Sequence, residues 1–256
     1  MRWTEAGLAL ALAGLAGSPG QNTHPTPAQA PQAPGAMPPA AQPATAHPFV
    51  VVLDAAHGGS DEGARLGKTA LEKTLTLTMA EHLQALLRQQ GIVVTMTRTA
   101  DVDLPALNRA QIANHAQAAV CLVFHATATG SGVHLFTSSL PAPQAVIAGV
   151  LASTPAATPD VLPWATVQAA AISDSLKLES ELDAALVHAE IPVTMGRASV
   201  APMDNLTCPA VAVELAPLAP GNTTKGRAIT DERYQETVEG ALAAAIGSWR
   251  VDRKQP

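Results

Sequence analysis

Three uninterrupted apolar runs constrain the fold of this chain more than any other feature. Each run is rich in apolar or β-branched residues and contains no charged side chain: 48–53, 119–124 and 209–213. Strands that are buried on both faces of a parallel sheet have this composition, whereas half-exposed strands alternate apolar and polar residues. We therefore expect the three runs to be buried strands of one sheet.

Segments with helical spacing separate these runs. Apolar residues recur every three or four positions after the first run: Leu71, Leu75, Met79, Leu83 and Leu86. Gly91 follows as a helix-ending residue and 92–97 as the next strand, which predicts a βαβ unit. Further elements are expected later in the chain: helices at 105–117, 165–189 and 231–249, a strand at 132–136, and an irregular insertion at 138–163. We expect one α/β catalytic domain at 48–250, with an open, mostly parallel sheet flanked by helices.

The composition fits a globular domain with an aliphatic core. Of the 256 residues, 47% are hydrophobic but only 3% are aromatic, so alanine, valine and leucine must fill the core. The formal net charge is −6 and the chain has no basic cluster, so it lacks the surface that neutralises nucleic-acid phosphates. We therefore expect no nucleic-acid partner.

The first 47 residues predict export rather than a second domain. Residues 1–20 contain the apolar run GLALALAGLAG, which has the length of a signal-peptide core and is too short to span a membrane. Because Glu5 offsets Arg2, a frayed hydrophobic terminus is the alternative. Residues 21–47 are rich in proline and alanine and predict a disordered linker. We expect an exported protein with no membrane span after signal cleavage, and a short tail at 251–256.

The two cysteines leave a choice between free thiols and a bridge. Cys121 and Cys208 are too few for a disulfide framework and too far apart in sequence for a zinc thiolate motif. Cys121 lies within the apolar run 119–124, and Cys208 directly precedes the run 209–213. Free cysteine is among the most buried residue types, so the sequence favours two buried thiols over a disulfide.

Metal-binding side chains follow the ends of the predicted strands. His57 lies just beyond the first apolar run, and His125 and Glu214 each directly follow one of the later runs. Open α/β sheets bind ligands at the carboxyl ends of their strands, so we expect these residues at one edge. Glu72 begins a helix at the same edge, although helix amino termini favour Glu in any case. Two histidines, one carboxylate and an open fourth position are a catalytic zinc ligand set.

The motifs around these residues resemble the zinc-dependent N-acetylmuramoyl-L-alanine amidases, which are bacterial cell-wall hydrolases. The matching elements keep the family's order over much of the chain: Asp54-Ala-Ala-His57-Gly-Gly-Ser-Asp61-Glu-Gly-Ala64, Glu72-Lys73, Thr97-Arg98, Arg109 to Asn114, Val123-Phe-His125-Ala-Thr127, and Pro209 to Glu214. The resemblance implies that His57, Glu72 and His125 bind Zn²⁺. It also implies that Glu214 is the catalytic carboxylate.

Other polar residues near these motifs have more than one interpretation. Arg98, Arg109 and Asn114 are candidates for substrate binding, and the two arginines could equally brace loops. Asp61 could support the metal site, but a turn former is the favoured interpretation. For His134, a histidine on a strand face is favoured over one that lines the substrate groove.

The resemblance implies hydrolysis of the amide bond between the lactyl group of N-acetylmuramic acid and L-alanine in peptidoglycan. The expected location is the periplasm, cell envelope or exterior of a bacterium, and the expected state is a monomer, with an activator protein left open. The chain departs from the family pattern at Ala56, Val123 and Thr127, and in the residues after Glu214. These departures keep one alternative, a peptidoglycan-binding pseudoenzyme or regulator. A zinc peptidase that acts on stem peptides in the same groove is a second alternative.

Overall fold

The computed structural model describes residues 48–141, 164–220 and 226–253 of the chain. The predicted signal peptide, the linker and most of the predicted insertion lie outside these ranges. Within the described ranges, no helix combines the length and hydropathy that a membrane crossing requires.

A mixed six-stranded sheet organises the described residues, in the order β2-β1-β3-β6-β4-β5. The strands are β1 (Val50–Ala55), β2 (Val93–Met96), β3 (Val120–Ala126), β4 (Val133–Ser138), β5 (Val193–Ala198) and β6 (Ala210–Leu215). Strands β2, β1, β3 and β6 are parallel, β4 runs antiparallel to β6, and β5 runs parallel to β4. This confirms the predicted open, mostly parallel sheet.

The three apolar runs of the sequence are the adjacent strands β1, β3 and β6. Every residue of β1 is buried. In β3 and β6 every residue is buried except His125 and Glu214, which are partly exposed near the carboxyl ends of their strands. Burial on both faces accounts for the lack of polar alternation in these strands. His125 and Glu214 therefore lie where the central strands become accessible to solvent, at the carboxyl edge of the sheet.

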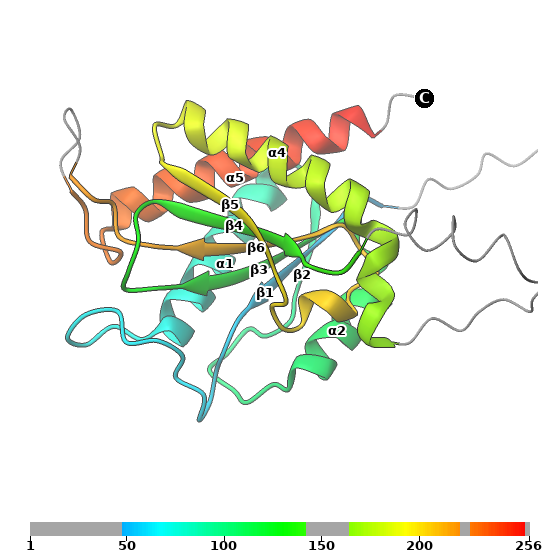
Figure 1. Cartoon of the computed structure of the whole chain (residues 1–256), viewed down its shortest axis with the longest axis horizontal. Coiled ribbons are helices and arrows are strands. Elements are labelled where there is room, and N and C mark those ends of the chain that lie inside the picture. The colour runs from blue at the N-terminus through cyan, green and yellow to red at the C-terminus, as the bar shows by residue number, and fades with distance from the viewer. Residues whose placement is uncertain (1–47, 142–163, 221–225, 254–256) are drawn as a thin grey trace, which may run out of the picture. The chain divides into compact units, whose positions relative to one another are not determined.

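Helices cover both faces of the sheet. On one face lie α1 (Glu72–Gln89), α4 (Ile172–His188) and α5 (Glu232–Asp252), whose leucine, valine and alanine side chains share the larger core cluster. On the other face, α2 (Ala106–His115) and the short 3₁₀ helix η2 (Met203–Asn205) form a smaller core with β1, β3 and β6. Figure 1 shows α4 and α5 side by side, with α2 on the opposite side of the sheet.

Three details differ from the sequence prediction. The helix expected at 165–189 begins as the 3₁₀ helix η1 (Trp164–Ala171) and becomes α-helical at Ile172. The last helix continues to Asp252, two residues beyond the expected domain end. The sequence does not predict β5, because this edge strand has no buried residue and therefore no apolar run.

A disulfide bond joins Cys121 to Cys208, which corrects the prediction of free thiols. Cys121 lies on β3, and Cys208 lies two residues before β6. Because β3 and β6 are parallel neighbours, they bring the two cysteines to a Cα separation of 6.0 Å across a sequence separation of 87 residues. This separation suits a disulfide. The sequence could not show it, because local patterns do not say which strands are neighbours.

One buried carboxyl group in α4 makes the stability of the fold depend on pH. Glu179 is 6% exposed, and burial, helped by the charge of Asp183, raises its pKa to about 7. Its stabilising protonated form is therefore fully present below the ordinary pKa of a glutamate and is lost as the pH rises through 7. We expect Glu179→Gln to remove this loss, so that the variant gains about 2 kcal/mol relative to wild type between pH 5 and pH 8. Urea unfolding of both proteins at the two pH values measures the gain, and an equal difference at both pH values would contradict it.

Candidate metal centre

The turn after β1 places His57 at the edge of the sheet. His57 has a φ of 62°, a left-handed conformation that is uncommon for residues other than glycine. Its Nδ1 lies 2.8 Å from Oδ2 of Asp61, which leaves Nε2 to face Glu72. Asp61 also accepts a hydrogen bond from the backbone N–H of Gly63, at 3.2 Å. Asp61 therefore shapes the turn and orients the imidazole, so both interpretations of this residue hold.

Glu72 is the first residue of α1 and lies almost completely buried between two histidines. Its Oε1 is 3.1 Å from Nε2 of His57 and 2.9 Å from Nδ1 of His125. The backbone N–H groups of Ala64 and Ala126 donate to Oε2 and Oε1, at 2.8 and 3.1 Å. The loop after β1 and the last residue of β3 thus fix the carboxylate from two sides.

The electrostatics of this group favour a charged carboxylate. Burial alone would raise the pKa of Glu72, but hydrogen bonds from His125 and His57, and from two backbone amides, hold it well below its usual range. The hydrogen bond with Glu72 raises the pKa of His57 above its ordinary value, against the effect of burial. A concentrated negative charge facing two imidazole nitrogens is an arrangement that a divalent cation would satisfy.

His57, Glu72 and His125 form a group that could hold a metal ion. Each residue offers one ligand atom, and the three atoms lie within 4.8 Å of one another. The two imidazole rings meet edge to face, with centroids 5.5 Å apart and planes at 85°. The structure thus brings together all three residues that the sequence proposes as ligands, from the ends of β1 and β3 and the start of α1.

Gly63 leaves the space that this group needs. Its φ is 65°, and a Cβ added there would lie 2.7 Å from Oε2 of Glu72 and 2.7 Å from Cδ2 of His57. Any larger residue would therefore clash with two members of the group while adopting an unfavourable backbone conformation. The family motif contains this glycine, but the reason for it appears only in the fold, where the turn brings Gly63 against His57 and Glu72.

Glu214 lies in a row of three polar side chains across neighbouring strands. In the strand register, Glu214 on β6 pairs with His125 on β3 and with His134 on β4. Nδ1 of His134 is 2.7 Å from Oε1 of Glu214. As the sequence favours, His134 lies on a strand face, and it is not among the residues that line the pocket beside the histidines. The sequence does not predict the contact with Glu214, because the pairing of His134 with Glu214 depends on β4 running antiparallel to β6.

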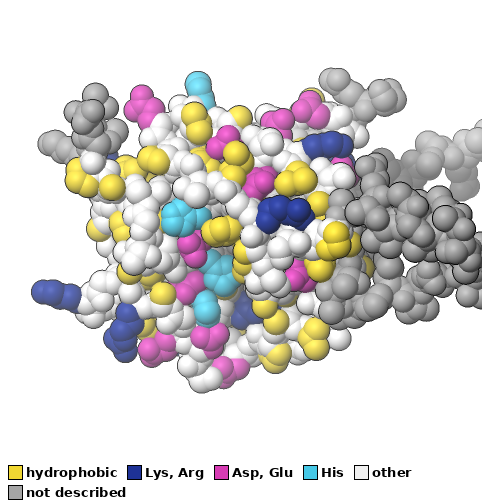
Figure 2. Space-filling view, viewed as in Figure 1, with side chains coloured by type: hydrophobic (Ala, Val, Ile, Leu, Met, Phe, Trp, Pro, Cys, Tyr) yellow, Lys and Arg dark blue, Asp and Glu magenta, His cyan; other side chains and the backbone are white. Residues whose placement is uncertain are grey.

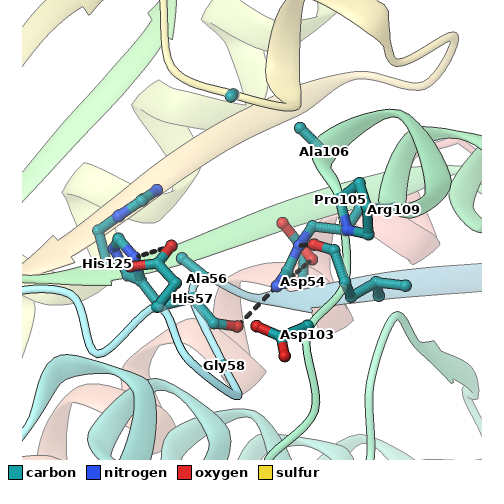
Figure 3. A pocket seen from close by; sticks show the side chains of 12 residues that line it. Asp54, Ala56, His57, Gly58, Asp103, Pro105, Ala106, Arg109 and His125 are labelled. Atoms are coloured by element: carbon teal, nitrogen blue, oxygen red, sulfur yellow. Dashed lines mark hydrogen bonds and ion pairs between the residues drawn. The ribbon is translucent and has the colours of Figure 1, made fainter.

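A pocket of about 420 Å³ adjoins the histidines. His57 and His125 lie at one end, and Asp54, Arg109 and Asp103 lie toward the other (Figure 3). Figure 2 shows histidine and acidic side chains gathered in the middle of one face of the molecule. The two histidines of the candidate metal-binding group therefore face this pocket.

Two arginines brace the loops around this pocket. Arg98 is 3% exposed and donates to the backbone carbonyls of Ala55, Ala56, Lys73 and Ala100. Arg109 donates to the carbonyls of Leu104, Ala55 and His57, and its Nη1 is 3.0 Å from Oδ1 of Asp54. Figure 3 shows Arg109 reaching toward the turn of His57. These contacts favour the bracing interpretation, and substrate binding by the arginines stays a prediction.

Asn114 lies at the junction of α2 with the segment that precedes β6. Its Nδ2 donates to the carbonyl of Asn205 at 2.9 Å, and its Oδ1 accepts from the backbone N–H of Thr207 at 2.8 Å. The structure does not place it among the residues that line the pocket beside the histidines. A substrate contact by Asn114 also stays a prediction.

The chain is similar in sequence to known amidases. The model of the N-acetylmuramoyl-L-alanine amidase family Amidase_3 matches residues 51–248. The amidase AmiC of Escherichia coli O6:H1 is 27% identical over 225 residues, which cover 80% of this chain and 54% of that protein. The amidase AmiA of Salmonella typhimurium is 38% identical over 77 residues, which cover 30% of this chain and 27% of that protein. The chain thus spans about a quarter to a half of the length of these relatives.

Solved structures of amidases share the fold. The catalytic domain of CwlV from Bacillus (Paenibacillus) polymyxa var. colistinus has a TM-score of 0.57 at 22% identity, covering 78% of this chain and 97% of that one. The CwlD amidase from Clostridioides difficile, in complex with the GerS lipoprotein, has a TM-score of 0.57 at 19% identity, covering 79% of this chain and 98% of that one. At these identities the likeness shows the fold alone. The family match over most of the described domain shows that the chain belongs to the N-acetylmuramoyl-L-alanine amidase family Amidase_3.

Proposed function

We propose that this protein is a zinc-dependent amidase of the bacterial cell wall. Its reaction would hydrolyse the amide bond between the lactyl group of N-acetylmuramic acid and L-alanine in peptidoglycan. The observation that carries the proposal is the convergence of His57, Glu72 and His125 at one edge of an amidase-family fold. Glu214, from the neighbouring strand, lies beside this group.

Zinc is the metal that suits this ligand set best. Two imidazole nitrogens, one carboxylate and no thiolate, with room left for a fourth ligand, are typical of catalytic rather than structural zinc sites. When bound, zinc would polarise the scissile carbonyl and lower the pKa of the attacking water. His57, Glu72 and His125 would hold it, and Asp61 would keep the ring of His57 in the correct orientation.

Glu214 is the group that we propose for proton transfer. Its side chain is 29% exposed, so water and substrate can reach it, and its Cα pairs with that of His125 in the strand register. It would accept a proton from the attacking water and return it to the amine of L-alanine as that amine leaves. The carboxylate of Glu72 cannot serve in this way, because its oxygens are occupied by two histidines and two backbone amides.

The proposed setting is the cell envelope. The apolar segment within residues 1–20, followed by the proline-rich segment 21–47, supports export of the domain. Peptidoglycan is the proposed substrate and binding partner. The complex of the structurally similar CwlD amidase with the GerS lipoprotein supports testing for an activator of this protein.

Mass spectrometry of digested peptidoglycan fragments tests the proposed reaction. The purified zinc-loaded protein should release intact stem peptides that carry a free L-alanine amine. Shortened stem peptides would instead identify a peptidase. Binding to peptidoglycan without any cleaved product, in a protein that holds zinc, would identify a pseudoenzyme or regulator and contradict the proposal.

A further inference from the structure

We propose that His134 is a positioning residue that holds the carboxylate of Glu214 in its working orientation. The inference rests on the proposed function, because it assigns His134 a task only if Glu214 transfers protons. Neither the strand pairing nor the packing of the core requires a histidine at this position. The contact with Glu214 does.

The sheet itself directs His134 toward Glu214. On β4, β6 and β3 the register partners His134, Glu214 and His125 project to the same face of the sheet. Two residues earlier on β6 and β3, and two residues later on antiparallel β4, the partners are Ala212, Val123 and Phe136, which belong to or pack against the smaller core. On this face of the sheet, the smaller core therefore ends at Ala212, Val123 and Phe136. The three polar side chains His134, Glu214 and His125 follow it toward solvent.

The hydrogen bond between the two side chains is short and partly sheltered. Nδ1 of His134 lies 2.7 Å from Oε1 of Glu214, and the side chains are 17% and 29% exposed. An ionised carboxylate accepts hydrogen bonds only, so Nδ1 must carry the hydrogen. Oε1 of Glu214 is then engaged by His134, and Oε2 is the oxygen that remains for proton transfer.

The ring of His134 is itself fixed by its surroundings. Gly130 has a φ of 89°, and a Cβ added there would lie 2.5 Å from Cε1 and 2.7 Å from Nε2 of the ring. The rings of His134 and Phe136 also meet edge to face, with centroids 6.4 Å apart. A glycine that admits the ring and an aromatic side chain beside it leave the imidazole little freedom, so its Nδ1 can hold a flexible glutamate in place.

The experiment compares two variants of similar shape that differ in one hydrogen-bond donor. In His134→Asn the amide nitrogen can take the place of Nδ1 and donate to Glu214, whereas His134→Leu has no donor. Loss of an orienting partner beside a metal site typically costs about 10–100-fold in activity. We expect His134→Leu to lower kcat by about 10–100-fold with KM and zinc content unchanged. We expect His134→Asn to keep kcat within about threefold of wild type, since it restores the donor.

Crystal structures of the two variants give a readout that does not depend on activity. The carboxylate of Glu214 should keep its orientation in His134→Asn and turn away in His134→Leu. Equal kcat values for the two variants, or an effect on KM alone, would overturn the proposal. So would an unmoved Glu214 in His134→Leu. An inactive wild-type protein that holds zinc would instead overturn the proposed function, so the two failures are distinguishable.

Gly130→Ala tests the same link without changing either member of the pair. The added Cβ should displace the ring of His134, so kcat should fall in the wild-type background. In the His134→Leu background the same change should have little further effect on kcat, because the hydrogen bond is already gone. Equal losses in both backgrounds would show that Gly130 acts by another route and would count against the proposal.

Discussion

Glu214→Gln is expected to abolish most of the hydrolysis while leaving the metal in place. The glutamine side chain has the shape of glutamate and its amide oxygen can still accept from His134, but it cannot take a proton from water. General acid–base groups contribute about 10²–10⁴-fold, and we expect kcat to fall by that factor. Because Glu214 is not in the metal-binding group, zinc content should equal that of wild type.

Steady-state kinetics on peptidoglycan fragments and metal analysis of the same preparations provide the test. Glu81→Gln is a matched control, since it makes the same change at an exposed position on α1 and should leave kcat unchanged. A Glu214→Gln variant that loses its zinc would make Glu214 a ligand instead of a proton carrier. A variant with wild-type kcat would show that another group moves the proton.

Arg109→Leu is expected to cost about 3–5 kcal/mol of unfolding free energy. Arg109 is 5% exposed and Asp54 is 2% exposed, so the substitution leaves a buried carboxylate without its cationic partner. It also removes donors from the carbonyls of Ala55 and His57, which shape the turn that leads into the metal site. The main effect should therefore be a loss of unfolding free energy, with a smaller, indirect loss of zinc affinity.

A double-mutant cycle separates bracing from substrate binding. If Arg109 mainly balances Asp54, the combination Asp54→Asn with Arg109→Leu should recover part of the stability lost by Arg109→Leu alone, because no unpaired charge is left. Urea unfolding of the four proteins measures this. Unchanged stability of Arg109→Leu together with a raised KM would instead establish the substrate-binding role.

The sequence predicts the three central strands because the composition of each strand alone is enough to recognise it. Strands β1, β3 and β6 are buried on both faces, so each is a continuous apolar run that can be recognised without its neighbours. The end of each run then marks a position at the functional edge. Of the two partly exposed residues in β3 and β6, one is the proposed ligand His125 and the other the proposed base Glu214.

The features that the sequence does not predict depend on which strands are neighbours. The Cys121–Cys208 disulfide requires the parallel pairing of β3 with β6, and the contact of His134 with Glu214 requires the antiparallel direction of β4. No local pattern states either relation.

The task of Arg98 also depends on the fold. Its charge suggests a ligand for anions, but in the fold its nitrogens donate to backbone carbonyls from three segments.

Zinc analysis of the purified protein tests the central claim most directly. The protein would be stripped with a chelator, dialysed against zinc and measured by metal mass spectrometry alongside peptide release. We expect a single zinc ion per chain in the wild type and in His115→Ala, a histidine variant exposed on α2. We expect close to none in His125→Ala, with peptide release restored by zinc in the wild type and His115→Ala. Full zinc loading of His125→Ala, or peptide release by the stripped wild-type protein, would contradict the account.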